Sequence, residues 1–195
     1  MGKFSQSRDP HTPVATLIEL SEDIDMGVRC GVAKQLSIPT PILIKLSNDE
    51  NEDVRYWVAR NPHTPSDILT KLANDYYMSI RSAVAENKHT PAEVLIKFVN
   101  DEISDIRLGV VRNSNCTKEI IDEFVNDKDI WVRIEVARRS ISKNILIKLA
   151  DDKDIDVREV VFMNPNCPEV IKLWLNNGGF AGLTLAEFIE KVDHE

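Results

Sequence analysis

The sequence predicts an all-α solenoid of about six to seven two-helix repeats, each about 26 residues long. Three observations predict this class: residues recur at a fixed spacing, apolar residues within each repeat follow a helical period, and strand-like alternation is absent. Self-similarity at a period of about 20 to 50 residues is the signature of stacked repeat architectures.

The repeat is defined by an arginine that recurs at intervals of 26, 26, 26, 26 and 25 residues. An aspartate stands six residues before each arginine, and a large apolar residue stands nine before it. The arginines are Arg29, Arg55, Arg81, Arg107, Arg133 and Arg158. Three residues after them stand Val32, Val58, Val84, Val110, Val136 and Val161. Four registers that agree over six units predict tandem structural repeats.

Each unit contains the pattern of two short helices. In the best-formed example, Thr64 is expected to cap the first helix and Pro65 suits its first position. A second helix is expected to begin near Asp75 and to end near Asn87, a residue type that tolerates the left-handed conformation. Helices of about ten residues are marginal in isolation, so they must stack on neighbouring units.

The two ends of the chain depart from the repeat. We expect an N-terminal tail at residues 1–8, the helical repeat array at 9–175 and a C-terminal cap at 176–195. A capping helix is predicted within residues 180–193, because Thr184 and Glu187 have the spacing of a capping box. Its apolar face would be Leu185, Phe188, Ile189 and Val192.

Composition restricts the possible partners and location. The net charge of −8 disfavours non-specific binding to nucleic acid or anionic lipid. No apolar run approaches the roughly 20 residues of a membrane span, and the N-terminus has no apolar signal region. The three scattered cysteines suit a reducing compartment, so a cytoplasmic location is expected.

Residues that often bind metals or carry out catalysis are explained by their place in the repeat. His11, His63 and His89 occupy equivalent turns, which should lie about 8–10 Å apart in adjacent repeats, too far for one zinc ion. Cys116 and Cys167 stand where other units have a turn threonine. Catalytic motifs are missing, so we expect no enzyme activity, no cofactor and no metal site.

The recurring aspartates and arginines have two possible explanations. They could line a basic groove for phosphates or acidic peptides, or they could form a structural ladder between units. Recurrence together with the core valines favours the ladder, because a binding site has no reason to repeat with the core.

Two positions on each second helix vary in character from unit to unit. The position after the repeat arginine holds Cys30, Tyr56, Ser82, Leu108, Ile134 and Glu159. The position five after it holds Lys34, Arg60, Glu86, Arg112, Arg138 and Met163. Both should face away from the core valines, and their aromatic, aliphatic and arginine side chains are typical of interface hot spots. The predicted partner-binding residues are Tyr56, Trp57, Arg60, Leu108, Arg112, Ile134 and Arg138. An ordinary solvated face is the alternative.

One stretch of the sequence contains, in order, Val54-Arg55, Val58-Ala59, Asn61-Pro62, Thr64-Pro65, Leu72-Ala73 and Asp75. This stretch resembles the leucine-rich repeat variant family, which is HEAT-like in style. The resemblance covers about residues 9–175 and implies a right-handed superhelix of short helices, some of them 3₁₀. Some members carry an N-terminal iron–sulfur cluster, which is not expected here because no cysteine precedes Cys30.

Three functions are compatible with these observations. The solenoid architecture and the residues at the two variable positions favour a non-enzymatic scaffold that binds a protein or peptide along the inner face of the solenoid. Nucleic-acid binding, with a fold like that of helical-repeat DNA glycosylases, is an alternative that the net charge of −8 disfavours. A purely structural role within a larger assembly is the third.

Overall fold

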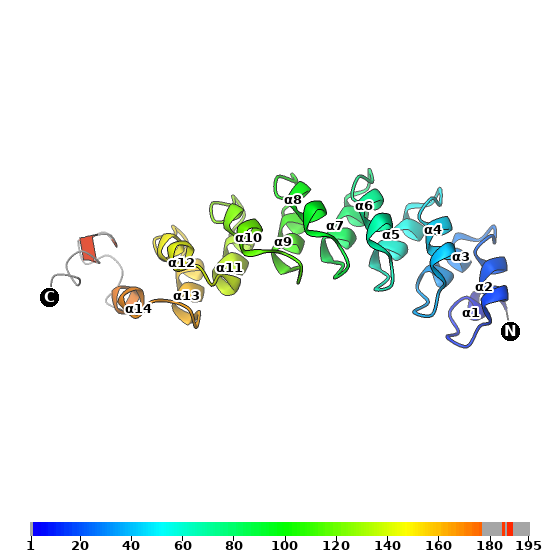
Figure 1. Cartoon of the computed structure of the whole chain (residues 1–195), viewed down its shortest axis with the longest axis horizontal. Coiled ribbons are helices and arrows are strands. Elements are labelled where there is room, and N and C mark those ends of the chain that lie inside the picture. The colour runs from blue at the N-terminus through cyan, green and yellow to red at the C-terminus, as the bar shows by residue number, and fades with distance from the viewer. Residues whose placement is uncertain (1, 177–184, 186, 189–195) are drawn as a thin grey trace. The chain divides into compact units, whose positions relative to one another are not determined.

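The computed structural model describes residues 2–176, 185, 187 and 188. Within them it is entirely helical and divides into two compact units, Met1–Asn115 and Cys116–Glu195. Each unit is a row of stacked helix pairs, which confirms the predicted all-helical repeat fold (Figure 1). All of the described helices are α-helices, so no helix of the described repeats is 3₁₀. The right-handed sense of the superhelix stays a prediction.

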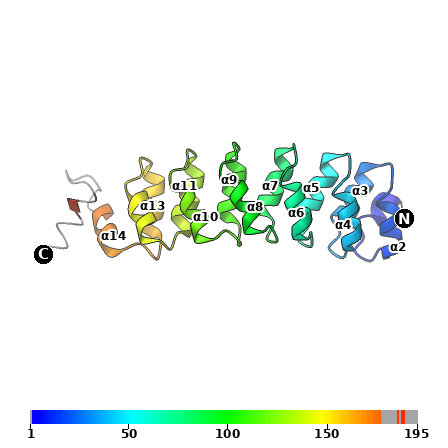
Figure 2. The same cartoon turned by 45° about the horizontal axis from the view of Figure 1, so that its top comes forward.

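The helices alternate between two positions in the repeat. First helices are α2 (Val14–Leu20), α4 (Thr40–Leu46), α6 (Ser66–Leu72), α8 (Ala92–Lys97), α10 (Lys118–Glu123), α12 (Lys143–Ala150) and α14 (Glu169–Asn176). Second helices are α1 (Lys3–Gln6), α3 (Met26–Ala33), α5 (Glu52–Arg60), α7 (Met78–Glu86), α9 (Ser104–Arg112), α11 (Ile130–Arg139) and α13 (Ile155–Met163). Within the first unit, α3, α5, α7 and α9 pack on one another in sequence. Figure 2 shows them as a row beside the row of α4, α6 and α8.

The core lies between the two rows of helices. The six recurring valines are completely buried, and the large apolar residues nine positions before the arginines are 1–4% exposed. Those residues are Leu20, Leu46, Leu72, Phe98, Phe124 and Leu149. Full burial of one such side chain stabilises the fold by about 1.5–3 kcal/mol. The predicted apolar registers are therefore confirmed.

An arginine–aspartate ladder joins successive repeats. Arg55 donates through Nε and Nη2 to both carboxylate oxygens of Asp75 in the next repeat, at 2.7 and 3.2 Å. Its Nη1 donates to the carbonyls of Asp49 and Glu50, where the loop approaches α5. Arg29–Asp49, Arg81–Asp101 and Arg133–Asp152 repeat the contact with the next aspartate. The structural explanation of the recurring charged residues is confirmed, because each ion pair joins two successive repeats.

A second ladder is built from asparagines that follow the arginines by six residues. Asn87 Nδ2 donates to the carbonyls of Ala59 and Asn61 in the preceding repeat, at 2.7 and 3.0 Å. Its Oδ1 accepts from the backbone N–H of His89. Asn61, Asn113 and Asn164 make the equivalent contacts. The left-handed backbone conformation expected at Asn87 is wrong, since Asn87 has φ −72° and ψ 125°. The hydrogen bonds of its side-chain amide explain why asparagine stands at this position.

The turn threonine has a different partner from the one expected. Thr64 does not cap α6, whose N-cap is Pro65 without a side-chain hydrogen bond. Instead Thr64 Oγ1 donates back to the carbonyl of Val58 near the end of α5, and Thr90 does the same to Val84. The hydroxyl therefore ties the turn to the helix before it, because the carbonyls of the last helical turn lack intrahelical donors.

The N-terminal segment, expected as a tail, contains a helix in the position of a second helix. Helix α1 packs on α3, and a Cβ added at Gly31 would lie 2.8 Å from the Cβ of Ser7. Gln35 Nε2 donates to the carbonyls of Ser7 and Asp9, as the asparagines do in later repeats. The predicted capping helix at residues 180–193 lies mostly outside the described residues.

Candidate protein-binding face

The candidate site is the exposed side of the second helices in the first unit, named here the second-helix face. Its residues stand one, two or five positions after a ladder arginine, and their character differs from repeat to repeat. They are Lys34, Tyr56, Trp57, Arg60, Ser82, Glu86, Leu108 and Arg112. The ladders hold the helices that carry them, so the spacing of these side chains is determined by the repeat.

An aromatic pair lies in the middle of this face. Tyr56 and Trp57 on α5 are both half-buried, and their rings meet edge to face with centroids 5.1 Å apart. Lys34 of the preceding repeat places its Nζ over the Trp57 ring, 3.7 Å from the centroid. Such a cation–π contact contributes about 0.5–1 kcal/mol at an exposed site and holds both side chains in place. The face therefore presents a preformed surface that is partly aromatic and partly cationic.

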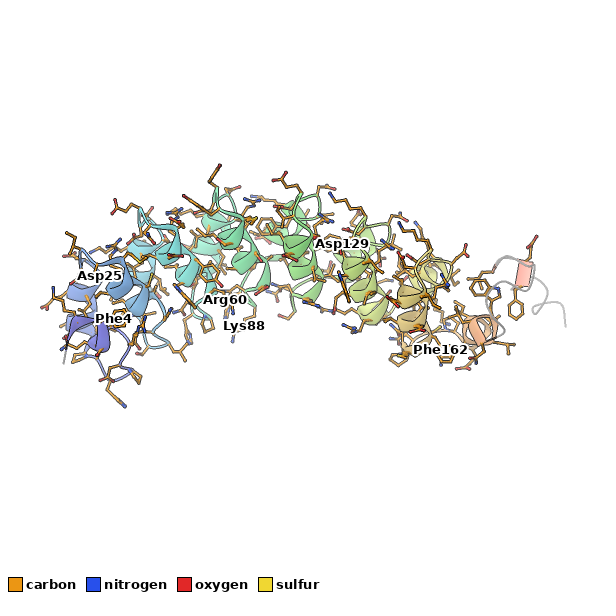
Figure 3. All side chains as sticks on the ribbon, turned by 180° about the vertical axis from the view of Figure 1, so that it is seen from behind. Phe4, Asp25, Arg60, Lys88, Asp129 and Phe162 are labelled. Carbon is orange, nitrogen blue, oxygen red and sulfur yellow. The ribbon has the colours of Figure 1, made fainter. Side chains whose placement is uncertain are left out.

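Arg60 lies beside a hollow on the same face. Its Nη1 donates to Glu86 Oε2 of the next repeat at 3.0 Å, and both side chains are about half exposed. The hollow, of about 250 Å³, is lined by Arg60, Pro62, Ala83, Glu86, Asn87 and Lys88. It forms where α7 has the small Ala83 in the position that Trp57 occupies on α5. Figure 3 shows Arg60 and Lys88 close together on this side of the unit.

The predicted site residues divide between the two units. Tyr56, Trp57, Arg60, Leu108 and Arg112 all belong to the first unit, where Leu108 is half-buried and Arg112 exposed. Ile134 and Arg138 belong to the second unit.

The exposure expected for Ile134 is wrong. This side chain is 7% exposed, as Cys30 is 6% exposed at the equivalent position, because α11 and α3 each bury six consecutive residues and so have no exposed side at this level. Arg138 is exposed and forms an ion pair with Glu135 at 2.9 Å. Trp131, two residues before the ladder arginine, is 63% exposed.

The three cysteines are buried and unpaired. Burial raises the pKa of Cys116 to about 11, which disfavours the thiolate. Burial also raises the pKa values of Cys30 and Cys167. In the described part of the chain, no three side chains of His, Cys, Asp or Glu are grouped so as to hold a metal ion.

We expect slow alkylation of Cys116 in the folded protein. At pH 8 a thiol with a pKa of about 11 has about 100-fold less thiolate than one with a pKa near 9, and the thiolate is the reacting species. Iodoacetamide labelling followed by peptide mass spectrometry should show at least this ratio between unfolded and folded protein. Equal rates in the two states would contradict the burial of this thiol.

Comparison with known proteins identifies the repeat. The family model described as leucine rich repeat variant matches residues 52–75. A solved structure described as a leucine-rich repeat variant with a novel repetitive protein structural motif matches with a TM-score of 0.65 and 29% sequence identity. The match covers 79% of this chain and 62% of that one, so the chain spans less than two thirds of the length of its structural relative. The comparison with curated proteins gives no match.

Among the described helices, none has both the length and the apolar character needed to cross a membrane. The sequence of the repeat at residues 52–75 and the helical-repeat fold of the chain both agree with the resemblance seen in the sequence. The repeat at residues 52–75 and the helical-repeat fold of the chain are thus similar to those of leucine-rich repeat variants.

Proposed function

We propose that this protein is a non-enzymatic scaffold that binds an extended segment of another protein along the second-helix face. The observation that carries the proposal is the half-exposed Tyr56–Trp57 pair, which Lys34 contacts through its ammonium group and which shares α5 with the exposed Arg60. Tyrosine, tryptophan and arginine dominate the binding energy of protein interfaces. A reducing, cytoplasmic setting remains part of the proposal.

The division of residues within the repeat supports a binding role. Arginines, aspartates and asparagines that recur are used in contacts between repeats, as Arg55–Asp75 and Asn87–Ala59 illustrate. The residues of the second-helix face vary while their backbone positions repeat. Regular helices that present varied side chains at a fixed spacing form the extended binding surfaces of repeat proteins.

The test is affinity capture from native lysate with a charge-reversed face. The variant Arg60→Glu/Arg112→Glu changes the two exposed arginines of the second-helix face. The matched control, Lys97→Glu/Lys118→Glu, makes the same change of charge at two exposed lysines of the first helices. Eluates are compared by mass spectrometry and by absorbance at 260 nm.

We expect a protein that the intact chain and the control retain and that the face variant loses at least tenfold. Equal retention by all three chains would contradict the proposed face. Retention of nucleic acid in place of protein would favour the alternative function, whose phosphate contacts would involve the same arginines.

A further inference from the structure

We propose that a second surface of the first unit, at the N-terminal ends of the second helices α7 and α9, binds a basic segment of a partner protein. This surface is the tyrosine edge, defined as Tyr76, Tyr77, Met78 and Ile103 together with the carboxylates of Glu50 and Glu102. It goes beyond the proposed function, because it shares no residue with the second-helix face.

The tyrosine edge has large apolar side chains in unusually exposed positions. Tyr76 is 90% exposed, Tyr77 is 41% exposed and Met78 is 58% exposed. The two tyrosine rings meet edge to face with centroids 5.5 Å apart. Aromatic residues and methionine are enriched at protein interfaces, whereas an isolated exposed apolar residue needs no explanation. Three consecutive exposed residues of this kind indicate a contact surface.

The helix that follows the tyrosines loses stability because of them. Asp25 caps α3 and Asn51 caps α5 through side-chain hydrogen bonds to backbone N–H groups. At the equivalent N-cap positions of α7 and α9 stand Tyr77 and Ile103, without a side-chain hydrogen bond. Replacing a capping side chain by an apolar one costs about 1 kcal/mol. Two adjacent repeats therefore lack a capping side chain on the same surface. Such a departure from a local folding preference is typical of a functional site.

The ladder places acidic loops on both sides of the tyrosines. Arg55 donates to the carbonyl of Glu50 at 3.1 Å, and its guanidinium carbon lies 5.7 Å from the Tyr77 ring centroid. On the other side, Arg81 donates to the carbonyl of Tyr76 and pairs with Asp101, which precedes Glu102. The tyrosines are therefore bordered by the loops that carry Glu50 and Glu102, both exposed.

The charge of this edge selects the partner. The ladder arginines beside it are directed into the loop carbonyls and the aspartates of the ladder, as Arg55 and Arg81 show. The loops that border the tyrosines carry the exposed carboxylates of Glu50 and Glu102. Lysine and arginine side chains bind both to carboxylates and over the faces of tyrosine rings. A basic segment therefore complements the tyrosine edge better than an acidic or purely apolar one.

The test measures the binding of two labelled peptides to the full chain by fluorescence anisotropy. The basic probe is fluorescein-labelled Gly-Arg repeated six times, and the acidic probe is Gly-Glu repeated six times. We expect saturable binding of the basic probe at low ionic strength, weakened by added salt, and at least tenfold weaker binding of the acidic probe. Equal binding of the two probes, or no binding of the basic probe at millimolar concentration, would overturn the proposal.

The variant Tyr76→Ser/Tyr77→Asn separates recognition from folding. It removes both rings and restores a residue type that caps helices, so its thermal stability should equal or exceed that of the intact chain. We expect about tenfold weaker binding of the basic probe, since both aromatic rings of the edge are removed. Unchanged affinity would show that the rings take no part and would overturn the proposal.

Two charge-matched variants test the carboxylates. Glu50→Gln/Glu102→Gln should weaken binding of the basic probe about fivefold, because the carboxylates on the bordering loops are removed. Glu19→Gln/Glu93→Gln neutralises two exposed first-helix carboxylates and should change it less than twofold. Equal effects of the two variants would mean that the net charge of the chain alone attracts the probe, which would contradict a binding site at the tyrosine edge.

Sedimentation of the intact chain distinguishes a different occupant. A dimer that Tyr76→Ser/Tyr77→Asn abolishes would mean that a second copy of this chain covers the edge, against the proposal. None of these variants alters Tyr56, Trp57 or Arg60. Failure at the tyrosine edge is therefore distinguishable from failure at the second-helix face.

Discussion

Replacement of Asn87 by alanine should lower the free energy of unfolding by about 3 kcal/mol, because it removes three hydrogen bonds in a buried position. The carbonyl of Ala59 would lose the amide donor, the carbonyl of Asn61 would keep only the Thr64 N–H, and the N–H of His89 would lose its acceptor. Urea denaturation followed by circular dichroism measures the change. Asn87 is 6% exposed, so water does not readily replace the amide.

Asn74→Ala is the matched control for this prediction. Asn74 is exposed, and its Nδ2 makes one long hydrogen bond of 3.3 Å to the carbonyl of Thr70 in the same repeat. We expect a change within about 0.5 kcal/mol. If the two variants unfolded at the same urea concentration, the asparagine ladder would not stabilise the stacking of repeats.

Replacement of Arg55 by methionine should cost about 3 kcal/mol at pH 7, because it leaves the carboxylate of Asp75 buried without its partner. The Asp75 side chain is 9% exposed. Arg60→Met, five residues later in the same helix, is the control. Arg60 and Glu86 form a half-exposed pair, so its loss should cost less than about 1 kcal/mol.

The cost of Arg55→Met should depend on pH. Burial alone would raise the pKa of Asp75, but hydrogen bonds from Arg55 and from the Tyr77 N–H bring it below its usual value. A carboxyl whose pKa is lowered in the folded state stabilises the fold above its unfolded pKa, near 3.9, and this contribution is lost as the pH falls through the folded pKa. The difference between intact and variant chains should therefore shrink between about pH 5 and pH 2. A difference that stays constant over this range would contradict the role of the ion pair.

Much of the fold could be predicted from the sequence because the recurring residues have recurring contacts. The valines and the residues nine before the arginines are buried as their register predicts. The arginine–aspartate ladder followed from the same regularity. The asparagine ladder could also have been found, since Asn61, Asn87, Asn113 and Asn164 each stand six residues after an arginine. It was missed because asparagine at a helix end has a common local explanation, which the extended backbone of Asn87 contradicts.

Other features depend on contacts that periodicity does not encode. Helix α1 has neither the arginine nor the valine of the repeat, and its docking relies on Gln35, which replaces the usual asparagine. Ile134 lies among six consecutive buried residues of α11, and the helical period of the apolar residues does not predict burial on all sides. The sequence also did not predict that Tyr76 and Tyr77 are exposed, because an aromatic side chain in a loop can equally well fold into the core.

The most direct test of the proposed scaffold is hydroxyl-radical footprinting of the chain, alone and in complex with the protein that it captures. Tyrosine, tryptophan and isoleucine side chains react with hydroxyl radicals and report their own accessibility in this measurement. We predict that the partner lowers the oxidation of Tyr56 and Trp57 at least threefold, while the exposed first-helix residues Ile18, Ile44 and Ile96 are unchanged. Protection confined to the first helices, with Tyr56 and Trp57 oxidised as in the free chain, would contradict binding at the second-helix face.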